Sequence, residues 1–367
     1  MSFGARADIR LDALLHNLEL LHSRQPASQV LAAVKANAYG HGIINVSRAL
    51  GDRVDALAVA RLSEARKLRA AGIATPIVLM GGVLDRDELA SALELHCDLV
   101  VHEPDQLELL ETSGGQARCR VWLKVNTGMN RLGVRTDDAA RLVARLRAVA
   151  GVRAIGLMTH LANADDLDDR RSLDQIERFR KLTDGFDGDI SIANSAALLG
   201  WNDRVSDPAF WNHQGEVWIR PGISLYGISP LRSHTALQLG LRHVMNFEST
   251  LVAVHDVAAG ESIGYGGTWT ARENTRLGVV AVGYGDGYTR ALPSGAPVLV
   301  NGRRVPVAGV ISMDLTVVDL GAGATDRPGD HVILWGDGLP VEELAAYAGT
   351  VPYTLVCGVI DRAGSVG

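Results

Sequence analysis

The sequence predicts an α/β protein in two parts: an N-terminal (β/α)8 TIM-like barrel and a C-terminal, mainly antiparallel β domain. Three observations support this prediction. The chain has 367 residues, more than one hydrophobic core usually serves, so about two domains are expected. Eight short apolar runs alternate with amphipathic segments before residue 220. Near Gly240 this alternation gives way to β-branched runs and turns, so we assign residues 1–240 to the barrel and 241–367 to the β domain.

The N-terminal part is expected to start with a strand at about residues 5–10 that packs with the second domain. A helix follows, with Asp12 as its N-cap and leucines on one face. The eight apolar runs are then predicted as strands at residues 30–34, 54–60, 76–80, 97–101, 120–125, 153–158, 189–193 and 216–219. Helix-like stretches lie between them at 61–72, 85–96, 103–115, 137–151 and 171–186. This order favours a barrel over the alternative, a doubly wound sheet.

The C-terminal part contains the β-branched runs, at residues 247–257, 276–288, 296–320 and 330–336. Asn301 and Gly302 form an Asn-Gly pair that predicts a tight hairpin between two strands. A short helix is expected at 341–349. Residues 201–216, which include Trp and Asn, interrupt the pattern before the eighth barrel strand and are expected to form a surface loop.

Charge and composition exclude several classes of function. The formal net charge is −6 and no long basic tract is present, which argues against a nucleic-acid or anionic-membrane partner and favours a small molecule. The three cysteines show no spacing typical of a metal site or a disulfide framework, so we expect no metal and a reducing compartment. The first residues carry charges and no apolar core, and no long apolar run follows, which predicts a cytoplasmic protein.

Polar side chains directly follow several of the predicted barrel strands. In such a barrel, the carboxyl ends of the strands meet at one mouth, where reacting groups belong. The residues at these positions are Lys35, Asn126 to Arg131, His160, Asn194, Ser195 and Arg220.

A lysine at the end of a buried strand can lose hydration, which frees its amine to form a Schiff base with an aldehyde. A phosphate on such a cofactor would bind at the loops after strands seven and eight, at the backbone N–H groups of Gly222 and Ile223 and the hydroxyl of Ser195. Each residue alone has a simpler explanation: Lys35 could be solvated at a strand end, and His160 could be an ordinary core residue. The Gly-flanked tyrosines of the second domain lack the GxGxxG spacing, so dinucleotide binding is not expected.

Many ordered motifs resemble one family, the pyridoxal-phosphate-dependent alanine racemases. They run through nearly the whole chain: "DIRLDALLHN", "AVKANAYGHG", "LKVNTGMNRLG", "MTHLAN", "NSAALLGW", "IRPGISLYGISP", "SIGYGGTW", "VGYGDGY", "VISMDLTVVDL" and "VPYTLVCGV". The resemblance implies a homodimeric enzyme that binds pyridoxal 5'-phosphate and an amino-acid substrate, with active sites shared across the dimer interface.

The resemblance also implies residue roles. Lys35 would bind the cofactor covalently and act as the base for the D-enantiomer, while Tyr265 would act on the L-enantiomer from the other subunit. Arg131 would contact cofactor and substrate carboxylate, and Met313 would offer its backbone N–H to that carboxylate. The remaining cofactor-binding candidates are Tyr39, Ser195, Gly222, Ile223 and Tyr353 at the phosphate, Asn194 beside them, Arg220 at the pyridine nitrogen and His160 behind the ring. Lys124 matches a lysine that is carbamylated in some members.

The expected activity is racemisation of L- and D-alanine by a two-base mechanism, supplying D-alanine for peptidoglycan or serving its catabolism. Alternatives are a racemase with a broader range that includes serine, a decarboxylase of the same fold, and a non-catalytic pyridoxal-phosphate carrier. The chain departs from the usual family pattern in its long 201–216 segment and at Thr354, where an acidic residue is more usual.

Overall fold

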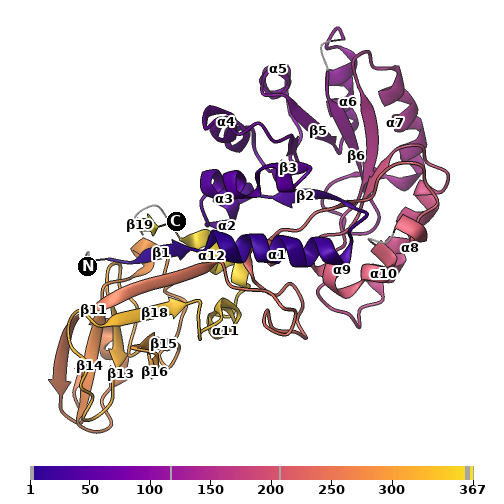
Figure 1. Cartoon of the computed structure of the whole chain (residues 1–367). Coiled ribbons are helices and arrows are strands. Elements are labelled where there is room, and N and C mark those ends of the chain that lie inside the picture. The colour runs from indigo at the N-terminus through magenta and orange to yellow at the C-terminus, as the bar shows by residue number, and fades with distance from the viewer. Residues whose placement is uncertain (1–3, 116–117, 206–207, 360–363, 367) are drawn as a thin grey trace.

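The computed structural model describes residues 4–115, 118–205, 208–359 and 364–366. Figure 1 shows a barrel and a smaller β domain, with helix α1 (Leu11–Arg24) lying at their junction. Helix α1 begins at Leu11 behind Arg10, which makes no side-chain capping bond, so the prediction of Asp12 as N-cap is wrong. Asp12 lies in the first turn instead, where a negative charge is favoured by the helix dipole.

Eight parallel strands form the barrel within the described residues, and all eight were predicted. Neighbouring strands pair in chain order. The last strand, β10, pairs with the first, β2, and a bridge between Ile190 and Val217 joins β9 to β10, so the barrel is closed. The strands are β2 (Gln29–Ala33), β3 (Ala56–Val59), β4 (Ile77–Leu79), β5 (Cys97–Val101), β6 (Arg120–Asn126), β8 (Ala154–Met158), β9 (Asp189–Ser191) and β10 (Trp218–Ile219); the short β7 (Val134–Arg135) pairs with β6.

Helices cover the outside of the barrel. The expected helical stretches at 61–72, 85–96, 103–115, 137–151 and 171–186 are confirmed as α4 (Leu62–Ala70), α5 (Arg86–Glu94), α6 (Pro104–Glu111), α7 (Thr136–Ala148) and α8 (Arg171–Thr183). The helices α3 (Ile43–Leu50), α9 (Ser195–Gly200) and α10 (Asn202–Val205) were not predicted. No described helix has the length and apolar character that crossing a bilayer requires.

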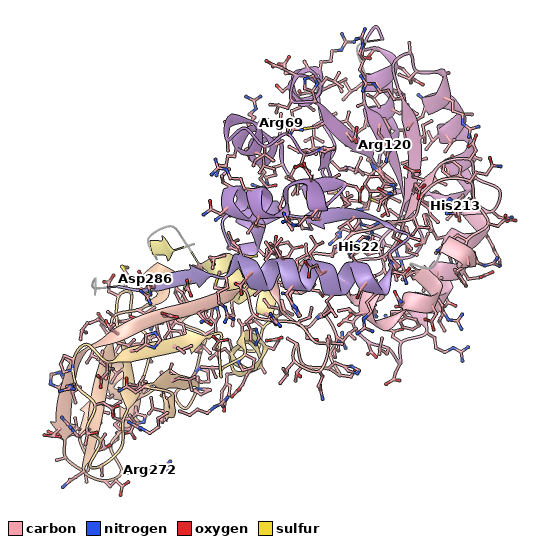
Figure 2. The ribbon with its side chains drawn as sticks, in the orientation of Figure 1. His22, Arg69, Arg120, His213, Arg272 and Asp286 are labelled. Carbon is pink, nitrogen blue, oxygen red and sulfur yellow. The ribbon has the colours of Figure 1, made fainter. Side chains whose placement is uncertain are left out.

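Side chains fill the amino-terminal end of the barrel. Arg120, at the start of β6 (Figure 2), forms an ion pair of 2.8 Å with Asp189, at the start of β9. Its guanidinium lies 5.0 Å from the ring centroid of Trp218, which meets Trp122 edge-on at 5.6 Å. Because this end is packed solid, a site with room for a ligand belongs at the other end.

The segment 201–216 is not the surface loop that the sequence predicts. It forms α10 and a 3-10 turn, and Trp211 is buried edge-on against Phe179 at 5.8 Å and Phe210 at 5.2 Å. Residues 206–207 of this segment lie outside the described residues. Its aromatic residues therefore anchor it to α8, which composition alone did not reveal.

The second domain is built mainly on antiparallel pairs around the long strand β11 (Met245–Val257), as predicted. The Asn-Gly hairpin is confirmed: Asn301 and Gly302 have φ of 49° and 79°, as a type I′ turn requires. The other elements are β12 (Ser262–Ile263), β13 (Trp269–Thr270), β14 (Thr275–Val280), β15 (Pro297–Val300), β16 (Arg303–Pro306), β17 (Thr316–Asp319), β18 (His331–Trp335), α11 (Val341–Tyr347), α12 (Pro352–Gly358) and β19 (Gly364–Val366).

Strand β1 (Arg6–Ile9) belongs to the sheet of the second domain, although it precedes the barrel in sequence. It pairs antiparallel with β11, with Arg6 opposite Glu248. The Arg6 guanidinium lies 2.8 Å from the Glu248 carboxylate, which also accepts a bond of 2.9 Å from His331 on β18. The chain therefore crosses between the two domains twice, once before α1 and once after residue 240.

Candidate active site

The carboxyl ends of the barrel strands bring several predicted residues together. Lys35 follows β2, Arg131 lies in the loop after β6, His160 follows β8, and Arg220 follows β10. Loss of hydration lowers the pKa of both Lys35 and His160, and the nearby positive charges of Arg131 and Arg220 lower it further. A cleft of about 920 Å³ opens beside them, lined by His160, Asn194 and Tyr353 among others.

The segment Lys35–Tyr39 (α2) is a turn of left-handed helix. Ala36, Asn37, Ala38 and Tyr39 have φ between 53° and 55°, a region that L-residues rarely adopt in succession. Four such residues cost roughly 4–8 kcal/mol relative to ordinary backbone. Strain of this size persists only where surrounding contacts stabilise it, and it is common at functional sites.

Contacts on both sides hold this turn. The Ala36 N–H donates to the Glu64 carboxylate of α4 at 2.6 Å, and the Gly40 N–H closes the turn on the Ala36 carbonyl at 3.1 Å. On the other side, the Nδ1 atom of buried His41 lies 2.8 Å from the Tyr39 carbonyl oxygen. Because Glu64 also binds the N–H groups that start α4, the turn is fixed to the barrel wall.

The turn places the amine of Lys35 in a positive environment. Solvent reaches this side chain, but the surrounding protein withdraws it from much of the water and lowers its pKa, with Arg131 as the next largest cause. Glu64 acts in the opposite direction and raises the pKa. A lowered pKa increases the neutral, nucleophilic fraction of the amine at neutral pH.

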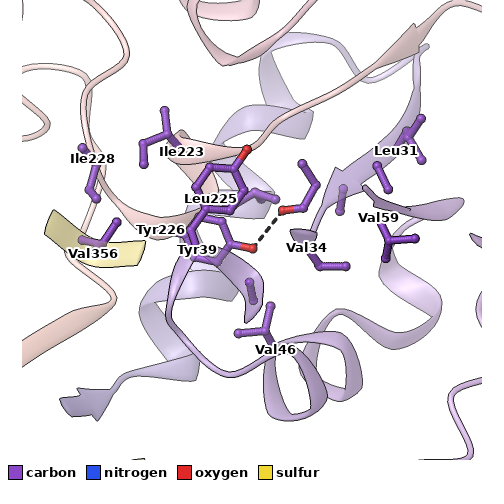
Figure 3. Packing of buried hydrophobic residues seen from close by; sticks show 14 of the residues in the cluster. Leu31, Val34, Tyr39, Val46, Val59, Ile223, Leu225, Tyr226, Ile228 and Val356 are labelled. Carbon is purple, nitrogen blue, oxygen red and sulfur yellow. Dashed lines mark hydrogen bonds between the residues drawn. The ribbon is translucent and has the colours of Figure 1, made fainter. Parts of the chain in front are cut away.

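Hydroxyl and N–H groups gather at the loops after β9 and β10. The Ser195 Oγ accepts the N–H of Gly222 at 2.8 Å and that of Ser224 at 3.3 Å, so its own hydrogen remains available to a ligand. Tyr39 packs beside Tyr226 (ring centroids 4.9 Å, Figure 3) and Tyr353 (6.0 Å). Ile223 begins the 3-10 turn Ile223–Tyr226 (η3) at this place.

Gly222 leaves the space that Tyr39 needs. A methyl group added at residue 222 would lie 2.7 Å from the Tyr39 hydroxyl oxygen, and the backbone there is not in the left-handed region. We expect the methyl group of Gly222→Ala to displace the Tyr39 hydroxyl and to weaken cofactor binding about 10–100-fold, which corresponds to the loss of one hydrogen bond to a charged group. Titration of the apoprotein followed by absorbance measures this, and Tyr39→Phe should reproduce it. Unchanged affinity in both variants would contradict a phosphate site here.

Arg220 is buried and held by neighbouring strands. It donates to the Ser191 hydroxyl and to the carbonyl oxygens of Thr159, at 2.6 Å, and Ile192, at 3.1 Å. Among the described residues these bonds use three of its five N–H groups, so others remain for a ligand. Burial lowers its pKa to about 10, which leaves it protonated at neutral pH. A guanidinium that keeps its proton can donate to a ring nitrogen without protonating it.

His160 and Lys124 lie beside the two arginines. Burial lowers the pKa of His160 well below its usual value, with Arg220 as the next cause, so the imidazole is neutral. Burial likewise lowers the pKa of Lys124 to about 8, and Arg220, Arg131 and Lys35 add to the shift. The neutral imidazole of His160 can therefore pack against the face of a cofactor ring. The Lys124 amine is surrounded by positive charges, which would stabilise a negatively charged group formed on it.

Other predicted residues do not meet at this mouth. Tyr265, which lies between β12 and β13, is 71% exposed, and Met313 is 52% exposed. Figure 1 shows β13 at the end of the second domain away from α2, and Figure 2 shows nearby Arg272 at the same tip. Asn194 lines the cleft, but its side chain caps α9 by accepting the Ala197 N–H at 2.9 Å.

Sequence reasoning missed three residues that shape the site. Tyr226 donates to the Ala33 carbonyl at 2.9 Å, Glu64 binds Ala36, and His41 binds the end of the turn. Glu64 accepts the Arg61 N–H at the start of α4 at 3.0 Å, but Arg61 is not one of the usual N-cap residues, so the sequence gives no clear signal for this contact or for the one with Ala36. For Tyr226 no local signal exists, because its partner is distant in sequence.

The assembled groups fit a phosphate-bearing aldehyde cofactor. A nucleophilic amine, a protonated guanidinium, a neutral imidazole and a hydroxyl-lined loop all lie at one barrel mouth. The space that Gly222 leaves beside the Tyr39 hydroxyl supports the phosphate side independently. Lys35 would hold the aldehyde carbon, and the hydroxyls of Ser195 and Tyr39 would hold the phosphate. The predicted phosphate contact of the Gly222 N–H is not available, because this N–H donates to Ser195; Gly222 instead leaves room for Tyr39.

The chain matches known proteins over almost its full length. Family models described as "Alanine racemase, N-terminal domain" and "Alanine racemase, C-terminal domain" match residues 9–230 and 244–366. An alanine racemase of Vibrio cholerae is 46% identical over 361 residues, covering 98% of this chain and 97% of that protein.

Solved structures agree. The biosynthetic alanine racemase of Pseudomonas aeruginosa superimposes with a TM-score of 0.91 at 41% identity, covering 100% of this chain and 99% of that one. An alanine racemase of Bartonella henselae, described with covalently bound pyridoxal phosphate, gives 0.87 at 25% identity and covers 99% of both chains. With both family models and close relatives matched from end to end, the chain belongs to the alanine racemase family.

Proposed function

We propose that this protein interconverts L-alanine and D-alanine with pyridoxal 5'-phosphate as cofactor, using Lys35 and Tyr265 as bases on opposite faces of the substrate. The observation that carries the proposal is the Lys35 amine at the barrel mouth, where the surrounding protein removes part of its hydration and Arg131 adds a positive charge, both of which lower its pKa. The family to which the chain belongs supports the choice of alanine.

The cofactor supplies an electron sink for the pair of electrons left on the α-carbon when its proton is removed. The protein must then control where protons leave and arrive. Inverting the stereocentre requires one group to take the proton from one face and another to give a proton to the opposite face. The Lys35 amine and the Tyr265 hydroxyl are the two groups proposed for this exchange.

Arg220 favours this exchange over competing reactions. It keeps its proton, so it binds the ring nitrogen without adding a positive charge to the ring. By leaving the ring uncharged, Arg220 would limit how long the substrate stays deprotonated. This supports racemisation rather than decarboxylation, and Arg131 would bind the substrate carboxylate so that it is retained.

The protein is proposed to act as a homodimer in which Tyr265 of the partner subunit completes each site, together with the backbone N–H of the partner's Met313. Supporting this, both residues are exposed in the single chain and β13 lies far from α2. In a two-fold dimer, the same patch on each subunit would complete the site of the other.

Mixed dimers test this arrangement. We expect purified Lys35→Ala and Tyr265→Phe proteins to be nearly inactive alone, and to regain about one quarter of wild-type activity when subunits are exchanged at equal amounts. The fraction follows because half of the dimers are mixed and each mixed dimer has one intact site of two. If no activity returns although exchange is shown by mass spectrometry, both bases act within one chain.

The activity itself is tested with purified protein plus pyridoxal phosphate, incubated separately with L-alanine, L-serine and L-lysine. Chiral chromatography should show D-alanine forming fastest. Comparable D-serine would indicate a broader racemase, and an amine product without any D-enantiomer would overturn the proposal. The enzyme is proposed to work in the cytoplasm, where D-alanine would serve peptidoglycan synthesis or catabolism.

Lys124 is proposed to carry a carbamate. Its pKa of about 8 leaves part of the amine neutral at pH 7, and a neutral amine adds CO2 with release of one proton, giving an anion beside Arg131. With 13C-bicarbonate we expect a carbamate carbon signal that disappears below about pH 6, where the amine is fully protonated. The Lys124→Ala protein is the control, and a signal that survives in it would contradict the assignment.

A further inference from the structure

Buried His41 has a ring nitrogen without a partner. Its Nδ1 lies 2.8 Å from the Tyr39 carbonyl oxygen and 3.1 Å from that of Ala38. Carbonyl oxygens only accept hydrogen bonds, so Nδ1 carries the proton and Nε2 is an acceptor. His41 is 2% exposed, and within the described residues its Nε2 has no hydrogen-bond partner.

A second buried side chain beside the same cavity, from the second domain, carries a hydrogen-bond donor. Trp335 of β18 is 1% exposed, and its indole N–H also has no partner within the described part of the chain. Both residues, together with His243, line a cavity of about 10 Å³ between the barrel and the second domain. This volume is roughly that needed for one water molecule, and polar groups buried without a partner are rare in folded proteins.

We propose that His41 is a positioning residue for Lys35 and Tyr39, and that one buried water links it to Trp335. The water donates to the His41 Nε2 and accepts from the Trp335 indole N–H, with the half-buried His243 as a further partner. The proposal rests on the proposed function, because there Lys35 and Tyr39 hold the cofactor.

The neighbours of His41 show how it would position the site. Its ring packs against Tyr226 with centroids 4.5 Å apart, and Tyr226 donates to the Ala33 carbonyl, two residues before Lys35. His41 itself bonds the carbonyl of Tyr39. His41 and Tyr226 therefore hold the chain on both sides of Lys35, and the proposed water links His41 to the second domain.

A crystal structure of the holoenzyme tests the water directly. We expect an ordered water within hydrogen-bond distance of the His41 Nε2 and the Trp335 Nε1. A dry cavity overturns this part of the proposal. The presence of the water does not depend on turnover, so this experiment can fail or succeed independently of the proposed racemase activity.

A double-mutant cycle tests the link in solution. His41→Asn keeps a donor near the Nδ1 position but removes Nε2, and Trp335→Phe removes the indole N–H. Each substitution should lower the thermal midpoint of the holoenzyme. The double variant should show a smaller decrease than the sum of the two single decreases, because both substitutions break the same water-mediated link. Trp122→Phe is the matched control. Among the residues that the structure describes, the buried indole N–H of Trp122 also has no partner, yet Trp122 lies on a barrel strand and does not line the cavity, so its effect should add to that of His41→Asn. Additive losses with Trp335→Phe overturn the link.

The cofactor spectrum tests positioning. His41→Phe removes both ring nitrogens, and we expect weaker cofactor binding and a shifted absorbance band, whereas His41→Asn should restore the band by keeping the donor to the turn. An unchanged band and affinity in His41→Phe overturn the positioning role. An equal loss of cofactor affinity in His41→Phe and His41→Asn would also overturn the positioning role, because the hydrogen bond to the Tyr39 carbonyl would then not be the cause.

Discussion

The Lys35→Ala protein is expected to fold but to lose covalent cofactor and nearly all racemisation. Lys35 is solvent-accessible at the end of β2, so truncation removes little buried surface. It removes the only group proposed both to bind the aldehyde and to move a proton at one face of the substrate. We expect the rate to fall by a factor on the order of 10³ or more. Borohydride reduction followed by peptide mapping should label residue 35 in the wild-type protein and nothing in the variant.

Two variants control this experiment. Lys181→Ala removes an exposed lysine on α8 that pairs with Glu177 at 3.7 Å, and it should keep both label and activity. Lys124→Ala removes the other amine near the arginines and should still label at residue 35. A label found on Lys124 in the wild-type protein would reject the assignment of Lys35.

The Tyr265→Phe protein is expected to bind cofactor normally and to lose most racemisation. Because Tyr265 is 71% exposed in the single chain, the change should leave the free energy of unfolding nearly unaltered. Loss of one proton-transfer group should lower the rate by about 10²–10⁴-fold. The loss should also be one-sided: exchange of the α-proton with solvent deuterium should fall strongly for L-alanine and little for D-alanine.

Tyr347→Phe serves as the control for this variant, since Tyr347 is a half-exposed tyrosine on α11 outside the proposed site. Exchange should be unaffected there. Equal loss of exchange for both enantiomers in Tyr265→Phe would reject the assignment of one base to each face.

The fold could be predicted largely because its signals are local. Each barrel strand contains a short apolar run, several of these runs are followed directly by a polar residue, and the Asn301-Gly302 turn has a composition that fixes its backbone. The barrel in turn predicts that residues such as Lys35 and Arg220 meet at one mouth. The wrong prediction of Asp12 as the N-cap of α1 concerns only a helix boundary, which depends on a few weak contacts.

What the sequence did not predict depends on distant contacts. Asn37 alone tolerates left-handed backbone, but the alanines on both sides of it do not favour it, so a run of four such residues is not expected. The contacts that stabilise the run come from Glu64, His41 and Tyr226. Trp211 similarly turns an expected loop into a packed segment because Phe179 offers it a surface. The role of His41 became visible only once its hydrogen-bond partners were known.

The crossing of β1 into the second domain has a consequence for protein synthesis. Arg6 pairs with Glu248, 242 residues further along the chain. Ribosomes make the chain from its N-terminus, so β1 has no partner until β11 has emerged, and its unpaired edge is open to wrong pairing meanwhile. A barrel expressed alone as residues 4–240 would keep this orphan strand, with Ala7 and Ile9 uncovered. A barrel intended to fold by itself should therefore begin after Ile9, at α1.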